Sequence, residues 1–215
     1  MNLTFDLETI GTEDPSIIAE IIAGVTPPKT MSKPETIAAW TANDKPALVK
    51  EAIAKTSFNA GLGKIICIGF AVDDALPEAI SGADEAELIR KFYWTIVALN
   101  RRATTVTVIG HNIIGFDLPY LWKRSIVHGI QPLLTIPFKA KPWDENIRDT
   151  QQMWDGKEWT KLQNLCRYLG VPSSKSEMDG SMVWDYYREG RIEEIKKYCL
   201  QDVEATRECY RRMSI

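Results

Sequence analysis

The sequence predicts an α/β protein in which helices flank a mixed sheet, and three observations lead to this class. Residues 3–7 alternate apolar and polar side chains, the pattern of a strand with one face on a core. Residues 64–72 (KIICIGFAV) form an almost continuous apolar run, as expected for a strand buried on both faces. Helical segments then alternate with shorter strands, so the sheet and the helices are expected to form layers.

The remaining elements follow from spacing and from end signals. Two further strands are expected at residues 105–109 and 147–149. Apolar residues at helical spacing predict helices at residues 84–99, 116–127, 162–169 and 192–212. Asp84 is placed to cap the first of these helices, and Gly170 is placed to end the third.

About fifty residues separate the first two predicted strands, which is far too long for a hairpin loop. Two helical stretches, at residues 15–23 and 34–55, lie there on either side of Pro27 and Pro28. We therefore expect a helical insertion at about residues 12–60. The whole chain, residues 1–215, is expected to form a single domain, because this length suits one well-buried core.

Composition excludes several classes of protein. A hydrophobic fraction of 45% and a charged fraction of 26% are typical of globular chains, not of fibrous or disordered ones. The net charge of -3 means that any phosphate-binding face must be local. No apolar run approaches the roughly 20 residues of a membrane span, and a strand at the start leaves no room for a signal peptide. Widely spaced cysteines predict reduced thiols, so we expect a cytoplasmic protein that does not bind membranes.

Two acidic residues lie close together on the first predicted strand. Asp6 and Glu8 are two residues apart, so the alternation of a strand places both side chains on one face of the sheet. Like charges at this separation repel each other and need compensation. Taken alone, the pair is more typical of an exposed acidic strand end than of a functional site.

Two later segments also carry acidic side chains. Asp117 follows a buried strand and leads into a helix, where helix capping is the simpler interpretation. Tyr198 and Asp202 are four residues apart in the last predicted helix, so both project from one face. Helices often carry this pair with the tyrosine in the core and the aspartate in water. Each segment by itself therefore leaves the function open.

Together, three fragments resemble the exonuclease motifs of the DEDD superfamily, and they occur in the same order: FDLET at residues 5–9, NIIGFDLPYL at 112–121 and YCLQD at 198–202. The tyrosine four residues before the last aspartate resembles the DEDDy branch, because the DEDDh branch has a histidine where this chain has Lys197. Within that branch the chain looks most like the proofreading exonuclease domain of family B DNA polymerases. It is especially similar to the predicted stand-alone exonucleases related to that domain, including residues 178–206 and the helical insertion.

The resemblance implies an RNase H-like fold. Its mixed five-stranded sheet has three antiparallel strands first, is flanked by helices and carries a helical insertion after the first strand. The implied activity is two-metal-ion 3'-to-5' exonuclease hydrolysis at the 3' end of DNA, with single-stranded DNA as the expected substrate. Because the chain begins at the first motif and ends shortly after the third, we expect a nuclease domain without a polymerase.

By the same resemblance, four carboxylates hold two divalent cations, either Mg²⁺ or Mn²⁺: Asp6, Glu8, Asp117 and Asp202. Asp6 would bridge the two cations, Glu8 and Asp202 would complete one of them, and Asp117 would bind the other directly or through water. Such ions neutralise the phosphate and lower the pKa of water. Oxygen ligands with no neighbouring Cys or His cluster favour hard cations over Zn²⁺. Tyr198, with an ordinary pKa of about 10, would orient the attacking water.

Four residues are implied to contact the terminal nucleotide: Thr9, Ile10, Asn112 and Phe116. Thr9 and Ile10 would do so through their backbone. His111, next to an element boundary, is interpreted as structural.

Cations near the third motif offer a local phosphate track, although a solvated charged helix face is an equally good interpretation. They are Lys175, Arg188, Arg191, Lys196, Lys197 and Arg207. Phe138, Trp143 and Trp154 are candidates for stacking on unpaired bases, or else belong to the core.

Two other functions stay open. A DEDDy exoribonuclease would use the same metal chemistry on RNA, which differs by its 2'-hydroxyl. A catalytically silent nucleic-acid-binding module would be expected to lack at least one carboxylate, and this chain keeps all four.

Overall fold

The computed structural model of the chain describes residues 1–99, 105–156, 158–172 and 178–214. Its contacts divide the chain into two compact units, one made of Met1–Thr9 and Ile65–Ile215 and the other of Ile10–Lys64. Among the described helices, none combines the length and the apolar character that a membrane crossing requires.

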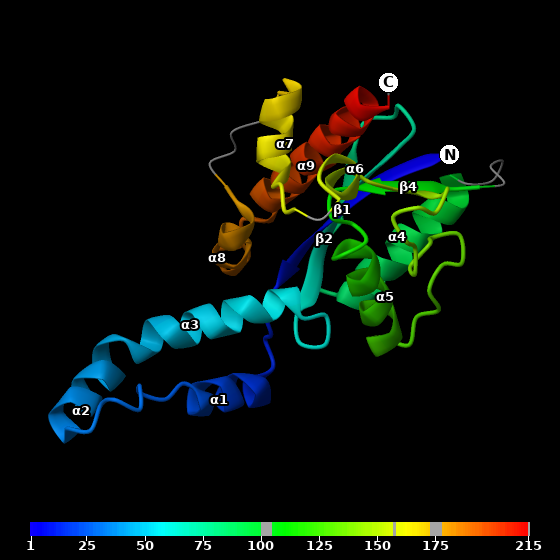
Figure 1. The fold of residues 1–215 in the computed structure, drawn as a ribbon. Coiled ribbons are helices and arrows are strands. Elements are labelled where there is room, and N and C mark those ends of the chain that lie inside the picture. The colour runs from blue at the N-terminus through cyan, green and yellow to red at the C-terminus, as the bar shows by residue number, and fades with distance from the viewer. Residues whose placement is uncertain (100–104, 157, 173–177, 215) are drawn as a thin grey trace. The chain divides into compact units, whose positions relative to one another are not determined.

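One five-stranded sheet has the strand order β3-β2-β1-β4-β5 (Figure 1). The strands are β1 (Asn2–Ile10), β2 (Lys64–Val72), β3 (Glu78–Ser81), β4 (Thr107–Gly110) and β5 (Ile147–Asp149). β4 runs parallel to β1 and to β5, whereas β2 and β3 are antiparallel. This mixed sheet confirms the predicted fold class.

The end of β2 meets the start of β1, which makes this pair antiparallel as well. The Asp73 N–H donates to the Asn2 carbonyl at 2.9 Å, and the Asn2 N–H donates to Asp73 Oδ1 at 2.8 Å. The first three strands are therefore antiparallel, as predicted.

Helices of the first unit cover both faces of the sheet. They are α4 (Glu85–Leu99), α5 (Asp117–Val127), α6 (Thr150–Trp154), α7 (Leu162–Leu169), α8 (Val183–Arg188) and α9 (Ile192–Met213), with a 3-10 turn η2 (Gly180–Met182). Phe5 and Phe70 pack on Phe92 of α4, with ring centroids 5.6 and 5.7 Å apart. On the opposite face, a Cβ at Gly69 would lie 2.7 Å from Cys199 Sγ, so α9 lies tightly against β2. Figure 1 shows α9 (red) and α4 (green) on the two sides of the strands.

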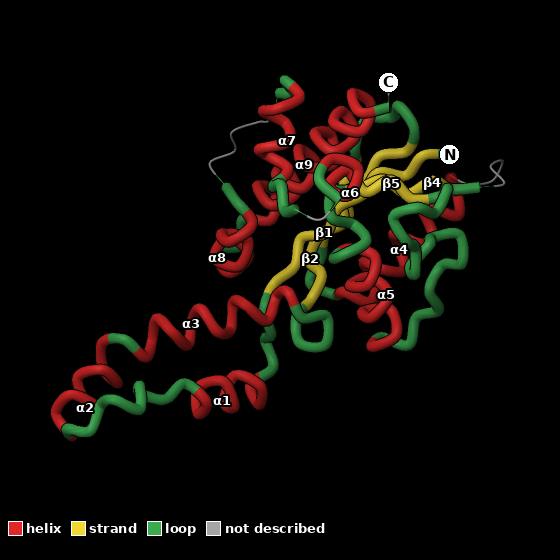
Figure 2. The backbone as a smooth tube through the Cα atoms, in the orientation of Figure 1, coloured by secondary structure: helices red, strands yellow, loops and turns green. Residues whose placement is uncertain are grey.

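The second unit contains the predicted helical insertion. It comprises α1 (Pro15–Gly24), α2 (Pro34–Asn43), α3 (Lys45–Lys55) and the 3-10 turn η1 (Thr56–Phe58), joined by the loops seen in Figure 2. The Thr56 hydroxyl joins the two ends of this unit, since it accepts from the Thr12 N–H at 2.7 Å and donates to the Ile53 carbonyl at 2.6 Å.

Several predicted boundaries were wrong. The single helix expected at residues 34–55 is two helices, because the Asp44 N–H closes α2 on the Trp40 carbonyl and Pro46 starts α3. β1 is longer than residues 3–7, and the strand expected at 105–109 begins at Thr107. β3, α6 and α8 were not predicted, because segments of four to six residues carry little periodicity. Asp84 does cap α4, with the Glu87 N–H donating to its Oδ1 at 3.0 Å.

A buried ionic network joins α4 to α5 and so positions the start of α5. Glu85 Oε1 accepts from the Ile65 N–H at 2.7 Å and from Arg124 Nε at 2.9 Å. Its Oε2 is 2.5 Å from Arg124 Nη2 and 2.7 Å from His128 Nε2. Burial raises the pKa of Glu85, but hydrogen bonds from Arg124, Ile65 and His128 outweigh it and hold the pKa below its usual range. The network is therefore made of an ionised glutamate and its donors.

Glu85→Gln is expected to destabilise the fold by about 3–5 kcal/mol, because it leaves the Arg124 guanidinium buried without its counter-ion. Glu87→Gln, on the exposed side of the same helix, is the matched control and should change stability by less than about 0.5 kcal/mol. Urea unfolding of both variants measures the difference. Equal midpoints for Glu85→Gln and wild type would show that the network contributes no net stability.

Candidate active site

Asp6 and Glu8 lie on the face of β1 that α9 covers. Phe5, which precedes Asp6 and therefore points to the opposite face of the strand, packs on Phe92 of α4. The Cys199 thiol of α9 lies 3.6 Å from the Asp6 carbonyl oxygen and 3.7 Å from Asp6 Oδ2. Glu8 is only 6% exposed. The strand therefore presents two carboxylates into the layer between the sheet and α9.

α9 adds Tyr198 and Asp202 to the same layer. The Tyr198 hydroxyl donates to the Asp202 carboxylate one helical turn away, and both residues interact electrostatically with Asp6 and Glu8. The close approach of the helix at Gly69 brings them there, since any side chain at that position would push α9 off the sheet.

Asp117 reaches the site from the first residue of α5. Its Oδ1 accepts from the Leu7 N–H at 3.0 Å, in the middle of β1 between the two strand carboxylates. The side chain is 4% exposed, and its charge raises the pKa of Asp6. Three segments far apart in sequence thus bring the five predicted residues to one place.

Burial and mutual repulsion disfavour ionisation of the four carboxyl groups. Burial is the main cause, and it raises the pKa of Asp117 to about 8 and that of Asp202 to about 6. The pKa values of Asp6 and Glu8 are also well above their usual range, through burial first and then through the neighbouring carboxylates. Tyr198 responds in the same direction, because burial and the adjacent acids raise the pKa of its hydroxyl.

This donor set fits divalent cations. Over residues 1–99, 105–156, 158–172 and 178–214, no lysine, arginine or histidine forms an ion pair with any of the four carboxylates. Carboxylates buried without a counter-ion are costly unless a metal compensates them. Carboxylate oxygens are the ligands that Mg²⁺ and Mn²⁺ prefer.

One expectation about the donor set was wrong. Oxygen ligands with no Cys or His cluster beside them were predicted, yet Cys199 Sγ and carboxylate oxygens of Asp6 and Glu8 all lie within 4.8 Å of one another. Cys199 directly follows Tyr198 in the third motif, so its position in the sequence was the available signal.

Asn112 lies in a loop organised by a residue that sequence reasoning missed. Asp149, 3% exposed at the end of β5, accepts from the Asn112 N–H at 2.9 Å and from the Ile114 N–H at 3.1 Å. Asn112 has a φ of 57°, and a Cβ at Gly115 would lie 2.4 Å from its Oδ1. The loop therefore holds the Asn112 side chain in one orientation beside the start of α5.

The other predicted nucleotide contacts neighbour the acids in the sequence, because Thr9 and Ile10 follow Glu8 and Phe116 precedes Asp117. Thr9 is half-buried and interacts with Tyr120 of α5, and Ile10, the last residue of β1, is fully buried. Phe116 packs on the Tyr120 ring with centroids 5.2 Å apart.

His111 is structural, as interpreted. Its Nδ1 lies 2.9 Å from Thr150 Oγ1 and its Nε2 lies 2.8 Å from the Thr160 carbonyl oxygen. Burial lowers its pKa, so the imidazole is neutral and links β4 to the segment before α7.

Three of the five predicted cations that the structure describes are already engaged within the protein. Arg207 donates to the Asp73 and Ala75 carbonyls at 3.1 and 2.6 Å and so holds the β2–β3 turn. Arg191 pairs with two glutamates and covers the Tyr186 ring, and Lys196 pairs with Glu193. Arg188 and Lys197 are exposed. Lys175 lies outside the described residues.

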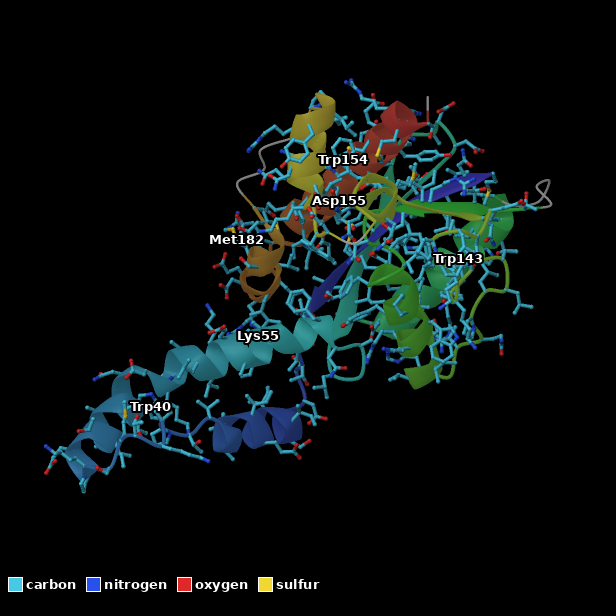
Figure 3. All side chains as sticks on the ribbon, viewed as in Figure 1. Trp40, Lys55, Trp143, Trp154, Asp155 and Met182 are labelled. Carbon is cyan, nitrogen blue, oxygen red and sulfur yellow. The ribbon has the colours of Figure 1, made fainter. Side chains whose placement is uncertain are left out.

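The three aromatic candidates differ in exposure. Phe138 is half-buried with its ring edge toward Tyr93, so it belongs to the packing around α4. Trp143, before β5, is 79% exposed, and Trp154, at the end of α6, is 42% exposed and stacks on Tyr168 (Figure 3). Only the tryptophans offer free ring surface.

The raised pKa values predict how the stability of the metal-free protein depends on pH. Asp117 and Asp202 bind protons more tightly when folded than when unfolded, so their stabilising effect is complete below about pH 4 and is lost as the pH rises through about 6 and 8. We expect the melting temperature with chelator to fall between about pH 5 and about pH 8. Mn²⁺ should restore it at the upper end. A chelated protein that gains stability steadily over this range would contradict the prediction.

Comparison with known proteins agrees with this architecture. Residues 69–215 match a family of predicted 3'-5' exonucleases related to the exonuclease domain of PolB, a range that includes Asp117, Tyr198 and Asp202 and begins after Asp6 and Glu8. The chain is 27% identical over 173 residues to the uncharacterized protein MJ0365 of Methanocaldococcus jannaschii, an alignment that covers 74% of this chain and 90% of that protein.

A solved family B DNA polymerase from the hyperthermophilic archaeon Pyrobaculum calidifontis has a similar fold, with a TM-score of 0.59 at 18% identity. The similarity covers 95% of this chain, which spans 23% of the polymerase. The fold is accordingly that of an RNase H-like polymerase exonuclease domain. The chain belongs to the family of predicted 3'-5' exonucleases related to the exonuclease domain of PolB.

Proposed function

We propose that the protein is a divalent-metal-dependent 3'-to-5' exonuclease that removes nucleotides from the 3' end of single-stranded DNA. The observation that carries this proposal is the meeting of buried carboxylates without counter-ions, contributed by β1, α5 and α9. Membership in a family of predicted 3'-5' exonucleases supports it independently.

In this proposal Asp6, Glu8, Asp117 and Asp202 hold two divalent cations, either Mg²⁺ or Mn²⁺. When bound, the cations neutralise the scissile phosphate and lower the pKa of the attacking water. Asp117 is oriented for this task by the Leu7 N–H, and α9 holds Asp202 opposite β1. The protein's own contribution is thus a set of ligands aligned before any substrate binds.

Tyr198 orients the attacking water through its hydroxyl. The raised pKa of this hydroxyl keeps it protonated at neutral pH, so it acts as a hydrogen-bond donor and acceptor and does not remove a proton. Its hydrogen bond to Asp202 ties the hydroxyl to a ligand of the site.

The terminal nucleotide is held by Thr9 and Ile10 through their backbone, by Asn112 and by the Phe116 ring. Asn112 is kept in its left-handed conformation by the Asp149 hydrogen bonds, and Phe116 is supported by Tyr120. A flat ring beside an amide suits an unpaired base at a strand end.

The test compares four substrates of one sequence: linear single-stranded DNA, the same DNA with a blocked 3' end, its covalently closed circle and the matching RNA. We expect linear DNA to be degraded, the blocked strand to be degraded more slowly and the circle to remain intact. Cutting of the circle at a comparable rate would show an endonuclease. Faster loss of RNA than of DNA would show an exoribonuclease.

A further inference from the structure

The buried thiol of Cys199 lies next to the strand carboxylates. Its Sγ and carboxylate oxygens of Asp6 and Glu8 lie within 4.8 Å of one another, and Cys199 itself is fully buried. Cys67 of β2 provides a second thiol, which forms a side-chain hydrogen bond with Cys199. This layer of the fold therefore combines hard oxygen donors with soft sulfur donors.

A second observation points to a ligand at the same place. Glu8 is 6% exposed, and within the described ranges of the chain its carboxylate has neither a hydrogen-bond donor nor a cation. A carboxylate side chain that is buried to this extent and lies beside a thiol is an acceptor that the protein itself leaves unfilled.

We propose that Asp6, Glu8 and Cys199 form a site for a thiophilic divalent ion of the Zn²⁺ class, which differs from the Mg²⁺ or Mn²⁺ site in having a sulfur ligand. The inference rests on the proposed function only in using the same two strand carboxylates. Zn²⁺ is held by thiolate and carboxylate ligands in tetrahedral sites, whereas Mg²⁺ has little affinity for sulfur. On binding, the metal–sulfur bond replaces the S–H bond and the proton passes to solvent.

The consequence is inhibition. An ion bound by Cys199 would also use Asp6 and Glu8, which are the two strand carboxylates that the proposed Mg²⁺ or Mn²⁺ site requires. Micromolar Zn²⁺ should therefore inhibit Mg²⁺-supported hydrolysis, and Cys199→Ala should be less sensitive to it.

The chain supplies its own control. Cys166 of α7 and Cys209 of α9 form another buried thiol pair, with Sγ atoms 3.6 Å apart. They pack in an apolar cluster with Leu165, Val171 and Ala205. Cys166→Ala thus removes a thiol of equal burial from a place that has no strand carboxylate.

The experiment titrates the reduced protein with Co²⁺ and records thiolate-to-metal charge-transfer absorption. Wild type and Cys166→Ala should show the band. Cys199→Ala should lose it, with Co²⁺ affinity reduced by at least the roughly 10- to 100-fold that loss of an outer-shell partner costs. No band in wild type, or a band lost in Cys166→Ala and kept in Cys199→Ala, would overturn the proposal.

Zinc-edge X-ray absorption on a variant that carries both Cys166→Ala and Cys209→Ala, and so keeps Cys199 but not the second thiol pair, decides the matter even if Cys199→Ala fails to fold. A sulfur neighbour at about 2.3 Å supports the site, and a shell of nitrogen or oxygen alone rejects it. Mg²⁺-supported hydrolysis of single-stranded DNA, measured on the same sample, separates the two proposals. Hydrolysis without zinc–sulfur binding refutes only this inference, whereas zinc–sulfur binding without hydrolysis refutes only the proposed function.

Discussion

Asp6→Asn and Asp202→Asn are each expected to remove nearly all turnover while raising the thermal stability of the metal-free protein. Loss of a metal ligand costs several kcal/mol of transition-state stabilisation, which corresponds to about 10³-fold or more in rate. The same change removes a charge that burial and neighbouring carboxylates disfavour. Activity and stability should therefore change in opposite directions.

Single-turnover hydrolysis and thermal melting in chelator at about pH 8 measure the two effects. Glu193→Gln, on the exposed side of α9, is the matched control and should change neither. Asparagine keeps the shape of aspartate, so a folding defect is not expected to obscure the result. Normal turnover in either purified variant would reject the assignment of that residue.

Tyr198→Phe is expected to slow hydrolysis by about 10²- to 10⁴-fold without abolishing it, because an orienting or acid-base group typically contributes that much. The variant keeps the ring and all four carboxylates and loses only the hydroxyl that donates to Asp202. Its Mn²⁺ affinity should change little. The pH–rate profile should keep the wild-type shape, since the tyrosine does not ionise in the working range.

Rapid-quench kinetics under single-turnover conditions, together with a Mn²⁺ titration, measure these effects. Tyr210→Phe, near the end of the same helix, is a control outside the site. If Tyr198→Phe matched the wild-type rate, Tyr198 would be a packing residue, and the assignment would rest on the carboxylates alone.

The sheet was predictable because its central strands carry strong local patterns. The apolar run of β2 predicted a strand buried on both faces, and the burial of β2 confirms it. The alternation around Asp6 predicted one buried face, which was wrong, because Thr4 and Glu8 on the other face are buried as well. The long final helix was predictable for the same reason, since its buried residues recur at helical spacing from Ile195 to Cys209.

Other features depend on the assembled structure. The role of Asp149 requires the end of β5 to lie beside the Asn112 loop, a neighbourhood created by parallel pairing with β4. The placement of Cys199 beside Asp6 depends on the absence of a side chain at Gly69. The Asp149 contact has no local sequence signal, because it joins residues distant in the chain. The position of Cys199 directly after Tyr198 places it near the third motif but does not show its distance from Asp6.

The most direct test of the account is the product pattern from 5'-labelled single-stranded DNA incubated with Mn²⁺ or with chelator. The account predicts labelled strands that shorten one nucleotide at a time from the 3' end, with Mn²⁺ only, and no shortening by Asp6→Asn. Immediate release of the labelled 5' nucleotide, or shortening that persists in chelator, would contradict it.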